Sequence, residues 1–383
     1  MRYYRTKIKT STNDNLPLQV DVPTKMKNMN QSPPIRLDVL ERISEIFIDH
    51  GCETSVQTRP KFKLSLAYSL YLLLRLSARN YYPKNSAQLR NLVNKVSSQL
   101  SSAAQNSCKD VGDEELIEKN VYWLSNTSEF LHIIKNDEII QEVMSQGSCK
   151  DPKAYDILTT AIDFLFQNLR NFIFKSLEHL YAGFLFTGNS DFTENLTEDE
   201  LPKTLPNAIV IDPADIDFSL CDGYLKYLLQ SCSHVMGKFR KGSLNPYLTF
   251  QLFAQLFHTM SAWIFNAIIT LEDIGECDWL TRTGTKKLLK RLDRVKFWAK
   301  SQGLEESAQC HLLKATQLCE LVLADRSKLE SLYKKSMSLL SLNSIQTEWI
   351  LAHLRDGPPI SDEWIDVIIT GAKNRRKSIG IED

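Results

Sequence analysis

The stretch that decides the fold runs from residue 245 to residue 271 and reads NPYLTFQLFAQLFHTMSAWIFNAIITL. It contains no charged residue and is too long for a strand, so we expect one long helix at the centre of the protein. On a helical wheel its polar residues share one narrow sector, and apolar residues fill the rest of the circumference. The polar sector holds Gln251, Gln255, His258, Ala262 and Asn266.

A helix that is apolar around most of its circumference is either buried in a large protein or spans a membrane. The length of this helix suits a bilayer. In hydrocarbon, however, two Gln, one His and one Asn would lack hydrogen-bond partners, at a cost of several kcal/mol for each unsatisfied group. We therefore predict a core helix and no transmembrane segment. Neighbouring helices are then expected to satisfy these polar side chains, with His258 as a core histidine.

Composition places the chain among ordinary globular proteins. It has 383 residues, of which 43% are hydrophobic and 24% are charged. Lys and Arg number 46, as do Asp and Glu, and the resulting net charge of zero gives no indication of nucleic-acid binding. The N-terminal residues lack the apolar segment of a secretory signal. Eight Cys without a C-x-x-C pair are typical of reduced thiols, so we predict a cytoplasmic protein.

Helical periodicity and capping residues recur along the chain, and no stretch alternates convincingly with a period of two. We predict an all-α fold. Gly51 is expected to end the first helix, and the Ser-rich run 97–110 is expected to be a loop. The predicted helices lie at about 35–50, 62–79, 86–100, 113–140, 154–186, 220–241, 245–271, 286–300, 305–324, 326–336, 344–355 and 362–374.

Two segments are expected to lie outside the helical domain, which we place at residues 35–383. The first 36 residues hold seven Lys or Arg against two Asp, which predicts a basic flexible tail over residues 1–34. Residues 187–219 contain eight acidic residues and three Pro, which predicts an acidic flexible insertion.

No motif for catalysis or cofactor binding is present. The phosphate loop, G-x-S-x-G, H-E-x-x-H and dinucleotide patterns are all missing, so we predict no catalytic residue, no cofactor and no metal site. Cys310, His311 and Cys319 lack the spacing of a metal cluster, and core packing explains them better. An all-α enzyme with a site around His258 is kept as an alternative.

The segment 286–300 predicts a helix with one apolar and one basic face. Leu288, Leu292, Val295 and Trp298 share the apolar face. The basic face is either a solvated surface or a docking surface for an acidic partner, a lipid headgroup or the chain's own 191–217 segment. The candidate partner-binding site on this face consists of Lys286, Lys287, Lys290 and Arg294, and the acidic 191–217 segment is the next candidate.

Five segments in order resemble the dilute (DIL) domain family, which is found in the myosin V globular tail and in afadin-type and Radil-type adaptors. YWLSNTSEFLHIIK at 122–135 is similar to the W-L-S-N-T pattern of that family, and QLFAQLFHTMSAWIFNAIIT at 251–270 resembles the afadin version of its central helix. The other three segments are AYSLYLLLRLSARNYYP at 67–83, KFWAKSQGLEESAQCHL at 296–312 and LNSIQTEWILAHL at 342–354.

The resemblance covers roughly residues 62–372 and implies an elongated bundle of helices that binds protein partners on its surface and has no catalytic activity. Such partners are cargo adaptors and cytoskeletal or membrane-associated scaffolds, in actin-based transport of vesicles. The family's binding pockets cannot be transferred to this chain residue by residue. A self-regulatory module, in which the tail and the insertion bind the bundle, stays open as a further alternative.

Overall fold

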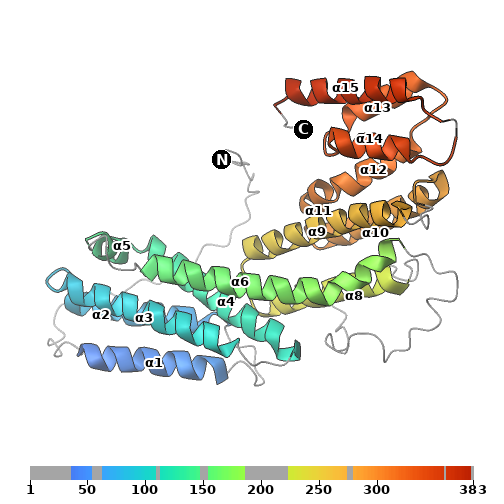
Figure 1. The fold of residues 1–383 in the computed structure, drawn as a ribbon. Coiled ribbons are helices and arrows are strands. Elements are labelled where there is room, and N and C mark those ends of the chain that lie inside the picture. Colours follow the sequence, from blue (N-terminus) through green and yellow to red (C-terminus); the bar gives the residue numbers. More distant parts are fainter. Residues whose placement is uncertain are drawn as a thin grey trace, which may run out of the picture.

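The computed structural model shows a protein built from helices. All regular secondary structure within the described residues is helical, which confirms the predicted fold class. Figure 1 shows an elongated arrangement with the first helices at one end and the last at the other. The expected tail (1–34) and insertion (187–219) lie outside the described residues. The described ranges are 36–53, 63–108, 113–146, 154–185, 223–273, 279–357 and 359–380.

The N-terminal half is a layered bundle. Helix α3 packs against α1 and α6, and α4 packs against α2 and α6. The largest fully buried side chains of this half include Trp123 and Phe130. The helices are α1 (Leu37–Glu53), α2 (Ser65–Tyr81), α3 (Ser86–Ser107), α4 (Asp113–Asn136), α5 (Glu138–Ser145) and α6 (Ala154–Glu178).

The C-terminal half is assembled around α9, with α11 and α12 packed against it. Figure 1 shows α13, α14 and α15 at the far end, in orange and red. The elements are η2 (His179–Phe184), α8 (Gly223–Lys241), α9 (Pro246–Asp273), α10 (Arg282–Ser301), α11 (Glu305–His311), α12 (Leu313–Leu323), α13 (Leu329–Ser338), α14 (Ser344–Ala352) and α15 (Asp362–Ser378).

Helix α9 is the predicted central helix, and its apolar residues form part of the core. Leu252 and Phe257 are both 0% exposed. By length and composition this helix could cross a bilayer, but η2, α11 and α12 pack against it as neighbours do around a core helix. The expectation for its polar sector was wrong, because Gln251, His258 and Asn266 are exposed. That side of the helix faces outward and is not packed into the core.

Helix α3 is longer than predicted, and the expected loop at 97–110 was wrong. The helix continues to Ser107. Leu100 and Ala104 are 0% exposed, and Ser101 is also buried. The small Ser and Ala side chains let α3 approach α1 and α6 closely, and burial then outweighs the weak helix propensity of serine.

Several predicted boundaries also differ, among them the end of the helix expected at 154–186, which stops at Glu178 before η2. Gly51 does not end α1, which continues to Glu53. The helix expected at 113–140 breaks at Asp137, and the one expected at 305–324 breaks at Leu312. At the first break, the Asp137 carboxylate accepts hydrogen bonds from two backbone N–H groups of α5, which starts a new helix.

Candidate functional site

Asn126 of the W-L-S-N-T segment positions the start of α2. Its Oδ1 accepts from the backbone N–H of Ala67 at 3.1 Å, and its Nδ2 donates to the carbonyl of Lys63 at 3.0 Å. Leu64 occupies the N-cap position just before α2, and its side chain makes no capping hydrogen bond. A buried side chain of α4 therefore supplies the missing cap and fixes α2 against α4.

Helix α2 has an apolar surface that no other described element covers. Its core face includes Leu70 and Leu74, both 0% exposed, whereas Leu72 is 64% exposed and Leu76 is 43% exposed. Because these two leucines are four residues apart, they lie together on one face of the helix. Exposed apolar side chains that adjoin a hollow are typical of an interaction surface.

The exposed leucines line an open hollow of about 380 Å³ between α2 and the start of α5. We call it the α2–α5 groove. Ile139 forms its α5 side, and two cationic side chains border it. A second hollow of about 570 Å³ lies along Tyr68, Tyr71 and the C-terminal end of α4, and it shares Arg75 and Ile139 with the groove. The groove is lined by Leu72, Arg75, Leu76, Ala78, Arg79, Tyr82 and Ile139.

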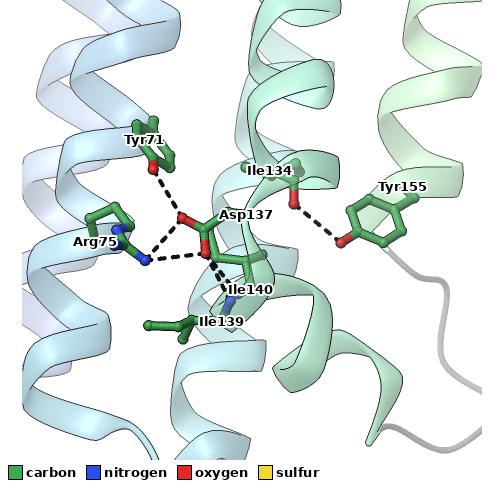
Figure 2. A network of polar contacts seen from close by, with 7 residues as sticks. All are labelled: Tyr71, Arg75, Ile134, Asp137, Ile139, Ile140 and Tyr155. Atoms are coloured by element: carbon green, nitrogen blue, oxygen red, sulfur yellow. Dashed lines mark hydrogen bonds and ion pairs between the residues drawn. The ribbon is translucent and has the colours of Figure 1, made fainter.

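A polar network holds the two sides of the groove together (Figure 2). The hydroxyl of Tyr71 donates to Asp137 at 2.9 Å, and the Arg75 guanidinium forms an ion pair with the same carboxylate at 3.0 Å. Asp137 also accepts from the backbone N–H groups of Ile139 and Ile140 at 3.0 and 3.1 Å. One buried carboxylate thus connects α2 to the first turn of α5.

The tyrosines of this region remain hydrogen-bond donors. Burial, followed by the hydrogen bond to the Asp137 carboxylate, raises the pKa of Tyr71. Burial also raises the pKa of Tyr155, whose hydroxyl donates to the carbonyl of Ile134 at 3.4 Å (Figure 2). Near the other end of the groove, Tyr82 donates to Glu142 at 2.6 Å. Both sides of the groove are therefore held before any partner binds.

Asp137→Ala is expected to lower the free energy of unfolding by about 2–3 kcal/mol. The change removes the cap of α5 and leaves the hydroxyl of Tyr71 without its acceptor; the half-exposed Arg75 adds little. Asp137→Asn keeps a capping oxygen and should lose about 1 kcal/mol. Urea unfolding followed by circular dichroism measures both losses. Equal losses in the two variants would contradict the capping role.

The predicted basic face lies on α10, in the other half of the protein. Lys286, Lys287 and Lys290 are exposed and Arg294 is half-buried. The apolar face is buried as predicted, with Leu288 and Leu292 at 0% exposure. Within the described ranges, none of the four cationic side chains forms an ion pair. They are free to meet an anionic partner.

His258 lies close to His311, but it is exposed and does not belong to the core. Its ring lies edge-on to that of His311, with centroids 6.2 Å apart. Cys310, which was expected to pack in the core, is exposed, whereas Cys319 is buried as expected. Within the described residues, no group of three or more potential ligands is arranged to hold a metal ion.

Sequence reasoning missed the α2–α5 groove. Leu72 and Leu76 lie in the run YLLLRL, where they look like ordinary core leucines. Asp137 lies in KNDEII, which fits the interior of a helix as well as a break. The available signal was the Asn-Asp pair before an apolar run, since both residue types favour the N-cap position.

A protein-family model matches part of the C-terminal half. Residues 251–358, from α9 to the connection before α15, match the model of the DIL domain family. Mouse unconventional myosin-Vb is 23% identical over 267 residues, and the rat protein is 26% identical over 269 residues. Each match covers 67% of this chain but only 14% and 13% of those proteins. The chain thus spans about one seventh of the length of these relatives.

Solved structures share the fold over nearly the whole chain. The globular tail of Myo4p has a TM-score of 0.55 at 12% identity and covers 91% of this chain and 94% of that one. Myo2-GTD in complex with Inp2 has a TM-score of 0.52 at 16% identity, covering 90% and 85%. At this identity the likeness concerns the fold. The α2–α5 groove lies outside the residues that match the family model.

Proposed function

We propose that this chain, whose residues 251–358 match the DIL domain, is a non-enzymatic adaptor module that binds cytoskeletal or vesicle-trafficking proteins in the cytoplasm. The observation that carries the proposal is the pair of exposed leucines in a hollow whose two sides are already held by hydrogen bonds. A preformed apolar groove lowers the entropic cost of binding a peptide segment.

The groove determines what kind of segment fits. Leu72 and Leu76 offer apolar contact, so the partner segment needs apolar side chains spaced to meet both. Arg75 is already paired with Asp137, but Arg79 is exposed and makes no ion pair with any described residue. Arg79 is thus available to a carboxylate. We propose a short segment with two or more apolar residues next to an acidic one.

The comparisons support this class of partner. The solved relatives include a myosin V cargo-binding domain with a TM-score of 0.50, and the complex of Myo2-GTD with Inp2. The proposal for this chain is a partner of the same general class, a protein carried by or anchored to the cytoskeleton. We propose neither nucleic-acid binding nor catalysis for this chain.

Leu72→Glu is the test. Leu72 is exposed and contributes little to the core, so the variant should fold. It should lose partners that use the groove, because the new carboxylate removes an apolar contact and repels the acidic residue of the proposed partner segment. The measurement is affinity capture with the full chain, analysed by mass spectrometry. Val367→Glu is the matched control, since Val367 is 50% exposed on the distant α15. An unchanged set of partners for Leu72→Glu would contradict the proposal.

The basic face of α10 is a second proposed docking surface, supported by three exposed lysines without ion pairs in the described part of the chain. Replacing Lys286, Lys287, Lys290 and Arg294 by Glu should leave the buried leucines in place and invert the local charge. Partners that use this face should be lost, and the wild-type interaction should weaken as the salt concentration rises above about 0.15 M.

Affinity capture across a salt series measures this effect. Replacing Lys373, Arg375 and Lys377 by Glu is the control, because these exposed side chains form a cationic group on α15. If the α10 variant folds and keeps its partners at every salt concentration, the basic face is only a solvated surface.

A further inference from the structure

A pocket of about 270 Å³ with a mixed polar and apolar lining lies where α9, α11, α12 and the start of α14 meet. It belongs neither to the α2–α5 groove nor to the basic face of α10. His258 and Asn266 line it from α9, and His311 and Lys314 line it from the α11–α12 junction. Gln346 of α14 closes the remaining side. Four helices thus direct nitrogen-bearing side chains to one place.

The chemistry of the lining favours an anion. Lys314 carries a positive charge, two imidazoles can share or donate protons, and the described residues that line the pocket include no carboxylate. The rings of His258 and His311 lie edge-on with centroids 6.2 Å apart. Burial, and then the neighbouring His258, lower the pKa of His311. The negative charge of a bound anion would oppose both effects, because it favours the protonated imidazole.

Gln346 is held so that its amide nitrogen is available as a donor. Its Oε1 accepts from the backbone N–H of Asn343 at 3.1 Å, while Asn343 accepts in return from the N–H of Gln346 at 2.8 Å. This reciprocal capping box uses the oxygen of the Gln346 side chain and leaves its two amide protons for another acceptor.

Two apolar side chains that neighbour lining residues in the sequence are exposed. Ile345, which precedes Gln346, is 74% exposed, and Leu313, which precedes Lys314, is 37% exposed. A phosphorylated side chain carries about −1.5 to −2 charges and three acceptor oxygens, which matches a lining with several donors better than a carboxylate does.

We propose that this pocket binds the phosphate group of a phosphorylated serine or threonine on a protein partner. Lys314 supplies the fixed charge, His258 and His311 supply donors from two sides, and the Gln346 amide completes the set. The site lies in the C-terminal half and is independent of the groove proposed above, so either can fail without the other.

The test is nuclear magnetic resonance of the histidine Cε1–H signals of the full chain, titrated with N-acetyl-phosphoserine methylamide at constant ionic strength. The His258→Gln and His311→Gln spectra assign the two signals. Both histidine signals should shift as the phosphoserine derivative is added, and the shifts should reach a plateau. The unphosphorylated N-acetyl-serine methylamide and sodium chloride should cause no saturable shift, and inorganic phosphate should bind more weakly than the phosphoserine derivative.

Lys314→Met removes the charge but keeps the apolar stem, and it should weaken binding of the phosphoserine derivative at least tenfold. Lys373→Met, at an exposed lysine of α15, should leave the affinity unchanged. Should Lys314→Met fail to fold, His258→Gln on the exposed side of α9 takes its place, with an expected loss of at least threefold. Unsaturable shifts, or equal affinity in the Lys314 and Lys373 variants, would overturn the site; equal or tighter binding of inorganic phosphate would overturn the phosphorylated partner.

Discussion

Replacing Phe257 with aspartate is expected to leave the full chain unfolded or aggregated. Phe257 is 0% exposed at the centre of α9, and its ring lies 6.2 Å from that of Phe253. The change removes a large apolar side chain and buries a charge that has no partner. Removing such a ring alone costs about 3–5 kcal/mol, and an unpaired buried charge costs several kcal/mol more. The sum is comparable to the whole stability of a typical domain.

Gln251→Asp is the matched control, because Gln251 is on the exposed side of the same helix. It introduces the same carboxylate into water and should leave the fold intact. Size-exclusion chromatography and far-ultraviolet circular dichroism distinguish the two outcomes. A Phe257→Asp protein that is fully helical and elutes at the wild-type volume would contradict the placement of α9 in the core.

Trp298→Ala is expected to lower the free energy of unfolding by about 3–5 kcal/mol. Trp298 is 0% exposed, and its ring centroid lies 5.6 Å from that of Phe253. Its indole N–H donates to the hydroxyl of Ser233 at 2.8 Å. The substitution opens a cavity between α8, α9 and α10 and leaves that hydroxyl without its donor. The midpoint of urea unfolding should fall while its slope stays the same.

Two further variants separate the contributions to this loss. Ser233→Ala removes the acceptor of the indole N–H, together with the hydroxyl's own hydrogen bond to the carbonyl of Leu229 at 2.8 Å, and should lose about 1–3 kcal/mol. Phe297→Ala, at a neighbouring position that is 48% exposed, should change stability by less than about 1 kcal/mol. A loss at Phe297 as large as that at Trp298 would show that α10 is placed with the wrong face toward the core.

The strongly periodic elements could be predicted from the sequence, because an apolar stripe of helical spacing is stable only as a helix that buries that stripe. Helix α9 and the buried face of α10 at Leu288 and Leu292 follow from that pattern alone. Helix α3 beyond Leu100 could not be predicted, since its buried Ser101 and Ala104 carry almost no hydrophobic signal. Their burial depends on how closely α1 and α6 approach, which is a property of the assembled bundle.

The site was predictable only in part. Sequence and helical geometry are enough to predict one exposed basic face that holds Lys286, Lys287 and Lys290. The α2–α5 groove does not, because Leu72 and Leu70 are chemically identical and only the arrangement of neighbouring helices leaves the first exposed. Trp263 of α9 lies between these two cases, because it is half-buried and packs against the edge of the core.

The polar and aromatic contacts of α9 and α10 determine how short a recombinant fragment of the chain can be made. Trp298 donates to Ser233 of α8, Phe253 packs against Phe239 of α8, and the buried Arg291 donates to the carbonyl of Phe184 in η2 at 2.8 Å. A recombinant fragment cut to residues 251–358 would therefore begin inside α9 and lack the partners of its own aromatic residues. The segment that matches the family model is therefore smaller than the packed unit to which it belongs, and we expect shorter expression fragments to fold better if they begin before η2.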